Sequence, residues 1–197
     1  MSLPRFKTAF AAFAVSTLLA SPVLAENEHV APIQSLANEK VRTWMADPVV
    51  INAIKAQNAA HAALTQSDVD GLDKEWRAEV KAGSGKLTSK TLSNALSTYL
   101  KKVKAEGQGL YTEIFVMDDK GLNVGQSDVT SDYWQGDEAK WQKTYGSGSD
   151  QMHISKITID ESSQILQSQL SMTITDPASG KPIGAITVGI NVEQLGQ

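Results

Sequence analysis

The chain has 197 residues, no cysteine and a formal net charge of −4, from 18 basic and 22 acidic residues. The lack of cysteine excludes disulfides, thiol catalysis, iron–sulfur clusters and covalent haem attachment. The acidic residues are spread along the chain, which argues against nucleic acid or an anionic lipid surface as the main partner.

The first 25 residues have the features of a secretory signal peptide. Arg5 and Lys7 precede an apolar run over residues 9–20, and Val23-Leu24-Ala25 ends in small residues that a signal peptidase accepts. The run is shorter than the ~20 residues that span a bilayer, and no later stretch is long enough. We therefore expect export and cleavage near Ala25. The alternative is an uncleaved N-terminal anchor.

The expected mature chain, residues 26–197, is periplasmic and fits a single domain. It has 197 − 25 = 172 residues, and the loss of Arg5 and Lys7 changes the charge to 16 − 22 = −6. Without disulfides, burial alone must stabilise the fold.

Residues 26–106 carry helical periodicity. Apolar residues recur at three- and four-residue steps from Ile33 to Met45, and Asp47-Pro48 then interrupts the pattern. Proline suits the first turn of a helix and Asp47 is a good N-cap, so residues 33–64 form either one kinked helix or two helices.

Two further helices are expected before residue 107. Thr65 and Asp68 have the spacing of a capping box, and Gly83-Ser84-Gly85 ends the helix that they open. A last helix is expected from about Ser89 to Ala105.

Residues 107–197 change to the two-residue period of strands. A turn at Asp118-Asp119-Lys120-Gly121 predicts a hairpin. The expected strands are Tyr111–Met117, Leu122–Gln126, Ile154–Ile159, Ile165–Thr175 and Pro182–Val192. The predicted fold class is therefore α+β, with helices ahead of a five-stranded, largely antiparallel sheet.

This order of elements resembles that of Cache domains, which are PAS-like extracytoplasmic sensor domains. The residues that carry the resemblance are 114–121, the aromatic loop from Ser131 through Trp141, and 182–190. It spans about residues 30–195 and rests on the order of the elements more than on any one motif. The resemblance implies a domain that binds small organic acids, amino acids, amines or ions.

Members of that family sit on histidine kinases or chemoreceptors and take part in signal transduction. This sequence has no transmembrane segment in its expected mature part and no cytoplasmic output region. We therefore expect a stand-alone member that acts through a partner, such as a membrane receptor or kinase.

The segment SDVTSDYWQGDEAKWQKTY, residues 127–145, lies where PAS-like folds close over their pocket. Gly136 and the two acids after it predict a short helix, on which Trp141 and Tyr145 share a face. Aromatic walls with polar tips suit a pocket for a small polar or cationic molecule. Tyr133, Trp134 and Trp141 are therefore the predicted ligand-binding residues. The alternative is that the two tryptophans are core contacts.

Asp160 follows the third expected strand, at the far rim of the proposed pocket. Family members that bind amines or amino acids use an acid in this region, so Asp160 is the predicted polar anchor. The alternative is a solvated turn over residues 160–163.

No catalytic or metal-binding motif is present. His29, His61 and His153 lack zinc-site spacing, and there is no G-x-S-x-G elbow, phosphate-binding loop or EF-hand pattern. The sequence therefore predicts no enzyme, no metal and no cofactor.

The leading hypothesis is a periplasmic sensor-type domain that binds an amino acid, amine or organic acid. The competing hypothesis is a protein–protein interaction or assembly module with a vestigial pocket. A homodimer is compatible with either.

Overall fold

The computed structural model describes residues 28–159 and 164–195. The predicted signal peptide and the predicted anchor Asp160 lie outside the described residues. Within the described part of the chain, no helix is both long enough and apolar enough to cross a membrane.

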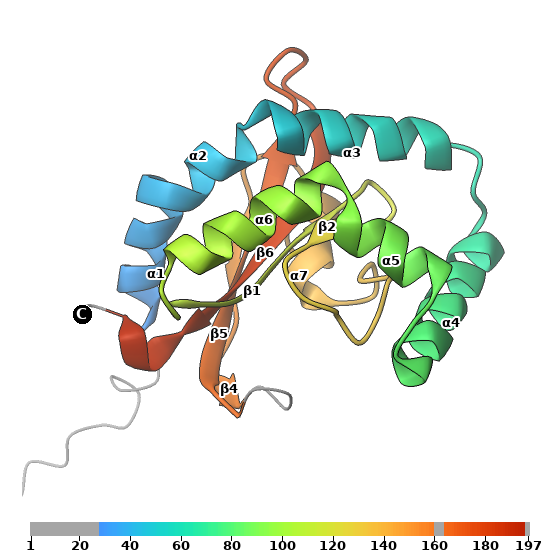
Figure 1. The fold of residues 1–197 in the computed structure, drawn as a ribbon. Coiled ribbons are helices and arrows are strands. Elements are labelled where there is room, and N and C mark those ends of the chain that lie inside the picture. Colours follow the sequence, from blue (N-terminus) through green and yellow to red (C-terminus); the bar gives the residue numbers. More distant parts are fainter. Residues whose placement is uncertain (1–27, 160–163, 196–197) are drawn as a thin grey trace, which may run out of the picture.

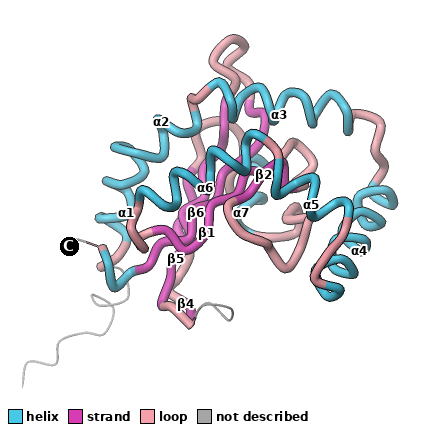
Figure 2. Tube along the Cα trace, in the orientation of Figure 1, coloured by secondary structure: helices cyan, strands magenta, loops and turns pink. Residues whose placement is uncertain are grey.

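Helices precede the sheet, as predicted, and Figures 1 and 2 show the helical first half lying across the strands. The helical elements are α1 (Val30–Leu36), the π-helical η2 (Ala37–Val41), α2 (Arg42–Met45), α3 (Pro48–His61), α4 (Gln66–Ala82), α5 (Lys86–Ser93) and α6 (Ala95–Glu106). The strands are β1 (Tyr111–Met117), β2 (Asn123–Gln126), β3 (Met152–Ile154), β4 (Thr158–Ile159), β5 (Leu166–Thr175) and β6 (Pro182–Asn191). The fold class is α+β.

The sheet is antiparallel throughout, in the order β2-β1-β6-β5-β3, and β4 also pairs with β5. The predicted hairpin of β1 and β2 is confirmed. The prediction of one strand over Ile154–Ile159 is wrong, because two short strands occupy this region. The Ser155 hydroxyl accepts the N–H of Gln169 at 2.9 Å, while the Ser155 carbonyl accepts the Ser168 hydroxyl at 2.8 Å. These side-chain bonds to β5 lie in the gap between β3 and β4, each of which pairs with β5.

Residues 30–61 form two helical segments rather than one kinked helix. Asp47 is extended and its carboxylate accepts the N–H of Val49 at 2.8 Å, with Pro48 at the first position of α3. The N-cap prediction at Asp47 is therefore confirmed. It could be made from sequence because the cap and the backbone N–H that it satisfies are only two residues apart.

The predicted capping box of α4 is also confirmed. The Thr65 hydroxyl accepts the N–H of Asp68, and the Asp68 carboxylate accepts the N–H of Thr65 at 2.8 Å. The Thr65 hydroxyl also donates to the Asp68 carboxylate at 2.6 Å, and this bond, followed by the bond from the Thr65 N–H, lowers the pKa of Asp68 below its usual value. Gly83 ends the helix in the left-handed region, with φ at 72°.

The prediction of one helix from Ser89 to Ala105 is wrong, because Asn94 divides it into α5 and α6. Asn94 is extended; its Oδ1 accepts the N–H of Ser97 at 2.7 Å and its Nδ2 donates to the Val124 carbonyl at 2.8 Å. The Ser97 hydroxyl also accepts the N–H of Gln126 at 2.9 Å. The break therefore satisfies polar groups of the edge strand β2, which pairs only with β1 along the sheet.

Replacing Asn94 by alanine is expected to lower the free energy of unfolding by about 1–2 kcal/mol, because one cap and one edge-strand contact are lost. Denaturant unfolding measures the change. Ser93→Ala, at the exposed neighbouring position, is the control and should change stability by less than about 0.5 kcal/mol. Equal effects of the two substitutions would show that Asn94 does not connect α6 to the sheet.

Three apolar clusters hold the sheet against the helices and against residues 127–145. The main core lies between the sheet and the helices α1, α2, α3 and α6. A second cluster joins α4 to the loop after β2 through Val69, Trp76, Leu122 and Tyr133. A third, on Phe115, Met117 and Ala185, is covered by Trp141 and Tyr145. Residues 127–145 thus cover the sheet face opposite the main core.

Candidate ligand-binding site

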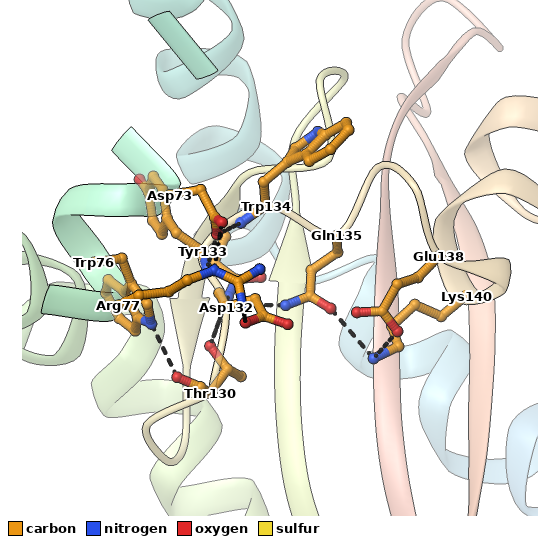
Figure 3. A network of polar contacts seen from close by, with 11 residues as sticks. Asp73, Trp76, Arg77, Thr130, Asp132, Tyr133, Trp134, Gln135, Glu138 and Lys140 are labelled. Carbon is orange, nitrogen blue, oxygen red and sulfur yellow. Dashed lines mark hydrogen bonds and ion pairs between the residues drawn. The ribbon is translucent and has the colours of Figure 1, made fainter. Parts of the chain in front are cut away.

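The segment of residues 127–145 is anchored to α4 as well as to the sheet (Figure 3). Asp73 Oδ1 accepts the N–H groups of Tyr133 at 2.9 Å and Trp134 at 3.0 Å. The Arg77 guanidinium contacts the carboxylates of Asp73 and Asp132, each at 2.7 Å. These contacts raise the pKa of Arg77, with the hydrogen bond to Asp73 as the largest cause. The backbone of the loop is therefore fixed at residues 132–134.

Trp76 of α4 provides a second anchor for the same loop. Its indole N–H donates to the Thr130 carbonyl at 2.9 Å, and its ring stacks on Tyr133 with centroids 5.2 Å apart and an interplanar angle of 22°. Tyr133 is 4% exposed. Burial, and next the charge of Asp118, raise the pKa of the Tyr133 phenol.

A cavity of about 420 Å³ lies between the sheet and this segment, at the place where the sequence predicts a pocket. Its volume falls within the range of small-molecule sites, about 300–1,000 Å³. We call it the polar pocket; its lining is Glu113, Phe115, Val129, Thr130, Ser131, Gln135, Lys140, Ile159, Gln167 and Gln169.

Lys140 supplies the positive charge of the polar pocket, from the short helix α7 (Ala139–Gln142). Its Nζ lies 2.9 Å from Glu138 Oε2, 3.2 Å from Gln135 Oε1 and 5.4 Å from the centre of the Phe115 ring. Figure 3 shows these polar groups converging on the ammonium. The Lys140 side chain is only 15% exposed, so the ammonium is fixed in place.

Glu113 supplies the negative charge, from β1. Its Oε1 accepts a hydrogen bond from Gln169 Nε2 of β5 at 2.8 Å, although β6 lies between these strands. The register places Gly189 of β6 beside both residues. A Cβ at position 189 would lie 2.8 Å from Glu113 Cγ and from Gln167 Oε1. The glycine therefore allows side chains of β1 and β5 to meet across β6.

The polar lining was not identified from sequence as a set of site residues. The available signal was the alternation of β5, which places Gln167 and Gln169 on the face opposite Leu166 and Leu170. From sequence alone, a polar strand face indicates exposure to solvent, because the pattern does not show which segment covers that face.

The predicted residues Trp134 and Trp141 do come together, but in a different cleft of about 350 Å³. We call it the tryptophan cleft; it is also lined by Leu64, Thr65, Gln66, Val69, Lys120 and Gly136. The indole N–H of Trp134 donates to the Lys120 carbonyl at 2.9 Å, and that of Trp141 to the Asp118 carbonyl at 3.2 Å. Both polar tips are thus already satisfied by the β1–β2 turn.

Tyr133 does not line the tryptophan cleft; it stacks on Trp76 in a cluster against which Trp134 also packs, and Asp160 is not among the described residues. Trp141 and Tyr145 do contact each other, with ring centroids 5.2 Å apart, but they do not share one helix, because α7 ends at Gln142 and Tyr145 begins a separate 3-10 turn. A ligand-binding role for Tyr133, Trp134, Trp141 and Asp160 stays a prediction.

Within the described ranges, no group of three or more histidine, aspartate or glutamate side chains is placed to hold a metal ion. The polar pocket offers side-chain amides, the Glu113 carboxylate and the Lys140 ammonium, which is paired with Glu138.

No protein-family model and no curated protein sequence matches the chain. Solved structures do match. The sensor domain of the V. cholerae histidine kinase DctB is 15% identical with a TM-score of 0.42, and the match covers 89% of this chain and 60% of that one. The E. coli DcuS sensor domain is 14% identical with a TM-score of 0.46, covering 84% and 95%.

The ligand-binding domain of the Pseudomonas aeruginosa PAO1 amino acid chemoreceptor PctC, solved in complex with GABA, is 10% identical with a TM-score of 0.37. That match covers 64% of this chain and 62% of the other, so the chain spans less than two thirds of the DctB and PctC chains. These three structures are sensor or ligand-binding domains, and each match has a TM-score below 0.5. The order of elements in this chain, helices before an antiparallel sheet, is the order that the sequence predicts.

Proposed function

We propose that the chain is an extracytoplasmic sensor-type domain that binds a small polar molecule in the polar pocket and acts through a partner protein. One observation carries the proposal: an ammonium, Lys140, and a carboxylate, Glu113, line the same cavity of about 420 Å³ together with side-chain amides. An amino acid zwitterion complements this arrangement, with its carboxylate toward Lys140 and its ammonium toward Glu113.

The hydrogen bonds around the two charges favour binding of a charged ligand. Gln135 and Gln169 each contact one of the charged groups and so orient it before a ligand arrives. A hydrogen bond to a charged group contributes about 1.5–3 kcal/mol when its geometry is good. Groups already held in position lose little entropy on binding.

Binding is proposed in preference to catalysis because of how a hydroxyl in the lining is hydrogen-bonded. The hydroxyl of Thr130, which lines the polar pocket, donates to the Asp132 backbone carbonyl at 2.7 Å and not to a side-chain base that could activate it.

A physical connection to α4 supports action through a partner. From Lys140, contacts run through Gln135 and the Asp132 carbonyl, and the Asp132 carboxylate pairs with Arg77. Figure 3 follows this path, and Figure 1 places α4 at the edge of the molecule. A partner that contacts α4 would meet a helix that shares contacts with the ligand-binding segment.

The test is a thermal-shift panel of amino acids, amines and organic acids, followed by calorimetric titration of any ligand that raises Tm. We expect Lys140→Met and Glu113→Gln each to weaken binding of a zwitterionic ligand by about tenfold or more. Lys143→Met, at an exposed position of the same segment, is the control and should leave the affinity unchanged.

Unchanged affinity in both pocket variants would refute the polar pocket as the binding site. A panel without any ligand, together with a stable dimer in solution, would favour the assembly module over the sensor-type domain.

A further inference from the structure

A second hollow lies away from the polar pocket, between α3 and the α5–α6 corner. It consists of a groove of about 590 Å³, which we call the α3 groove, and a smaller inner cavity of about 180 Å³. Gln57, His61, Lys90, Asn94 and Val124 line both, so the two spaces adjoin. No residue is shared with the lining of the polar pocket.

The α3 side of the groove contains a row of small apolar side chains beside the polar Asn52, Gln57 and His61. Val49, Ala53, Ala56 and Ala60 recur at steps of four, three and four residues, which places them on one face of α3. Leu96 and Val124, at 1% and 5% exposure, lie among the residues that line the groove. The three alanines leave room beside α3 for an aliphatic chain.

The residues that line both the groove and the inner cavity include two with basic, nitrogen-containing side chains, His61 and Lys90. His61 Nδ1 lies 2.9 Å from Asp118 Oδ2, and the Asp118 side chain is fully buried behind it. The carboxylate accepts the Nδ1 hydrogen of His61, and in that tautomer Nε2 is an acceptor, so the positive charge at the groove comes from the second residue, Lys90. Lys90 is exposed at the same end and adds a positive charge.

The start of α6 lies at the same place. Asn94 caps the N–H of Ser97, while Ala95 and Leu96, in the first turn of this 12-residue helix, line the groove. The first turn of a helix favours negative charge. Among the described residues, those that line the groove and the inner cavity include no aspartate or glutamate.

We propose that the α3 groove binds a small aliphatic carboxylate. The carboxylate lies near Lys90 and the start of α6, and the alkyl chain lies against the alanine row of α3. Charge complementarity selects the anion, and the alanine row selects the chain. This site is independent of the ligand proposed for the polar pocket.

The test titrates octanoate into the full chain by calorimetry. We expect saturable 1:1 binding that weakens about tenfold with octanamide, which has the same chain but no charge. Lys90→Met should weaken octanoate binding by a similar factor, whereas Lys86→Met, an exposed lysine of α5 outside the groove lining, should not.

A second pair of variants tests the apolar part. Ala56 and Ala59 are both exposed on α3, but only Ala56 lines the groove. Ala56→Leu should fill the groove and reduce octanoate affinity at least tenfold, and Ala59→Leu should leave it unchanged; equal affinities in this pair would overturn the proposal.

Variants of the two sites separate this proposal from the proposed function. Octanoate binding that persists in Lys140→Met supports the α3 groove, whatever the result for amino acids. No saturable octanoate binding, or loss of binding in Lys140→Met with retention in Ala56→Leu, would overturn the α3 groove and leave the polar pocket to be judged by its own variants.

Discussion

Trp76→Ala is expected to lower the free energy of unfolding by about 3–5 kcal/mol, the cost of truncating a fully buried tryptophan. Trp76 is 0% exposed and lies between α4 and the loop after β2. The substitution removes its stacking on Tyr133 and leaves the Thr130 carbonyl without the indole donor. Because Thr130 lines the polar pocket, ligand affinity should fall as well.

Denaturant unfolding with a constant m-value measures the stability of this variant. Trp76→Phe is the matched control: it keeps an aromatic ring against Tyr133 and loses the indole hydrogen bond, so it should cost less than the alanine variant. A loss below about 1 kcal/mol for Trp76→Ala would show that α4 does not anchor the ligand-binding segment.

Asp118→Ala is expected to be about as destabilising, at about 3–5 kcal/mol, because it removes one partner of a buried, hydrogen-bonded network. The Asp118 side chain is 0% exposed. Its Oδ2 accepts from His61 and Gln57 at 2.9 Å each, and its Oδ1 accepts the N–H groups of Lys120 and Leu122 at 2.9 Å each. The carboxylate therefore fixes the β1–β2 turn and connects it to α3.

The neighbouring acid provides the comparison for Asp118. Asp119 Oδ1 is buried without a hydrogen-bond partner among the described residues, and burial raises the pKa of this carboxyl. Asp119→Asn should therefore change the free energy of unfolding by less than about 1 kcal/mol, in either direction. If chemical denaturation finds the two substitutions equally costly, the hydrogen bonds of Asp118 are not what stabilises the turn.

The starts of α3 and α4 could be predicted because their capping groups are close in sequence. Asp47 bonds two residues ahead, and Thr65 and Asp68 bond each other across three residues. The break at Asn94 could not be predicted in this way. Its Nδ2 bonds the carbonyl of Val124, 30 residues away, and only the docking of β2 against the helices creates that partner.

In the candidate site too, some features could be predicted from the sequence, while others depend on partners that are distant in the chain. Its place between the sheet and residues 127–145 could be predicted from the order of the elements. Its lining could not, because Glu113 and Gln169 meet only through the register that places Gly189 between them. The placement of Tyr133 and Trp134 also depends on a distant residue, since Asp73 of α4 accepts the backbone N–H groups of both.

A crystal structure with the tightest ligand of the panel tests the central claim most directly. We predict density for the ligand in the polar pocket, with an anionic group within hydrogen-bonding distance of Lys140 Nζ and, for a zwitterion, an ammonium at Glu113. Density for the ligand in the tryptophan cleft, between Trp134 and Trp141, with only water in the polar pocket, would contradict it.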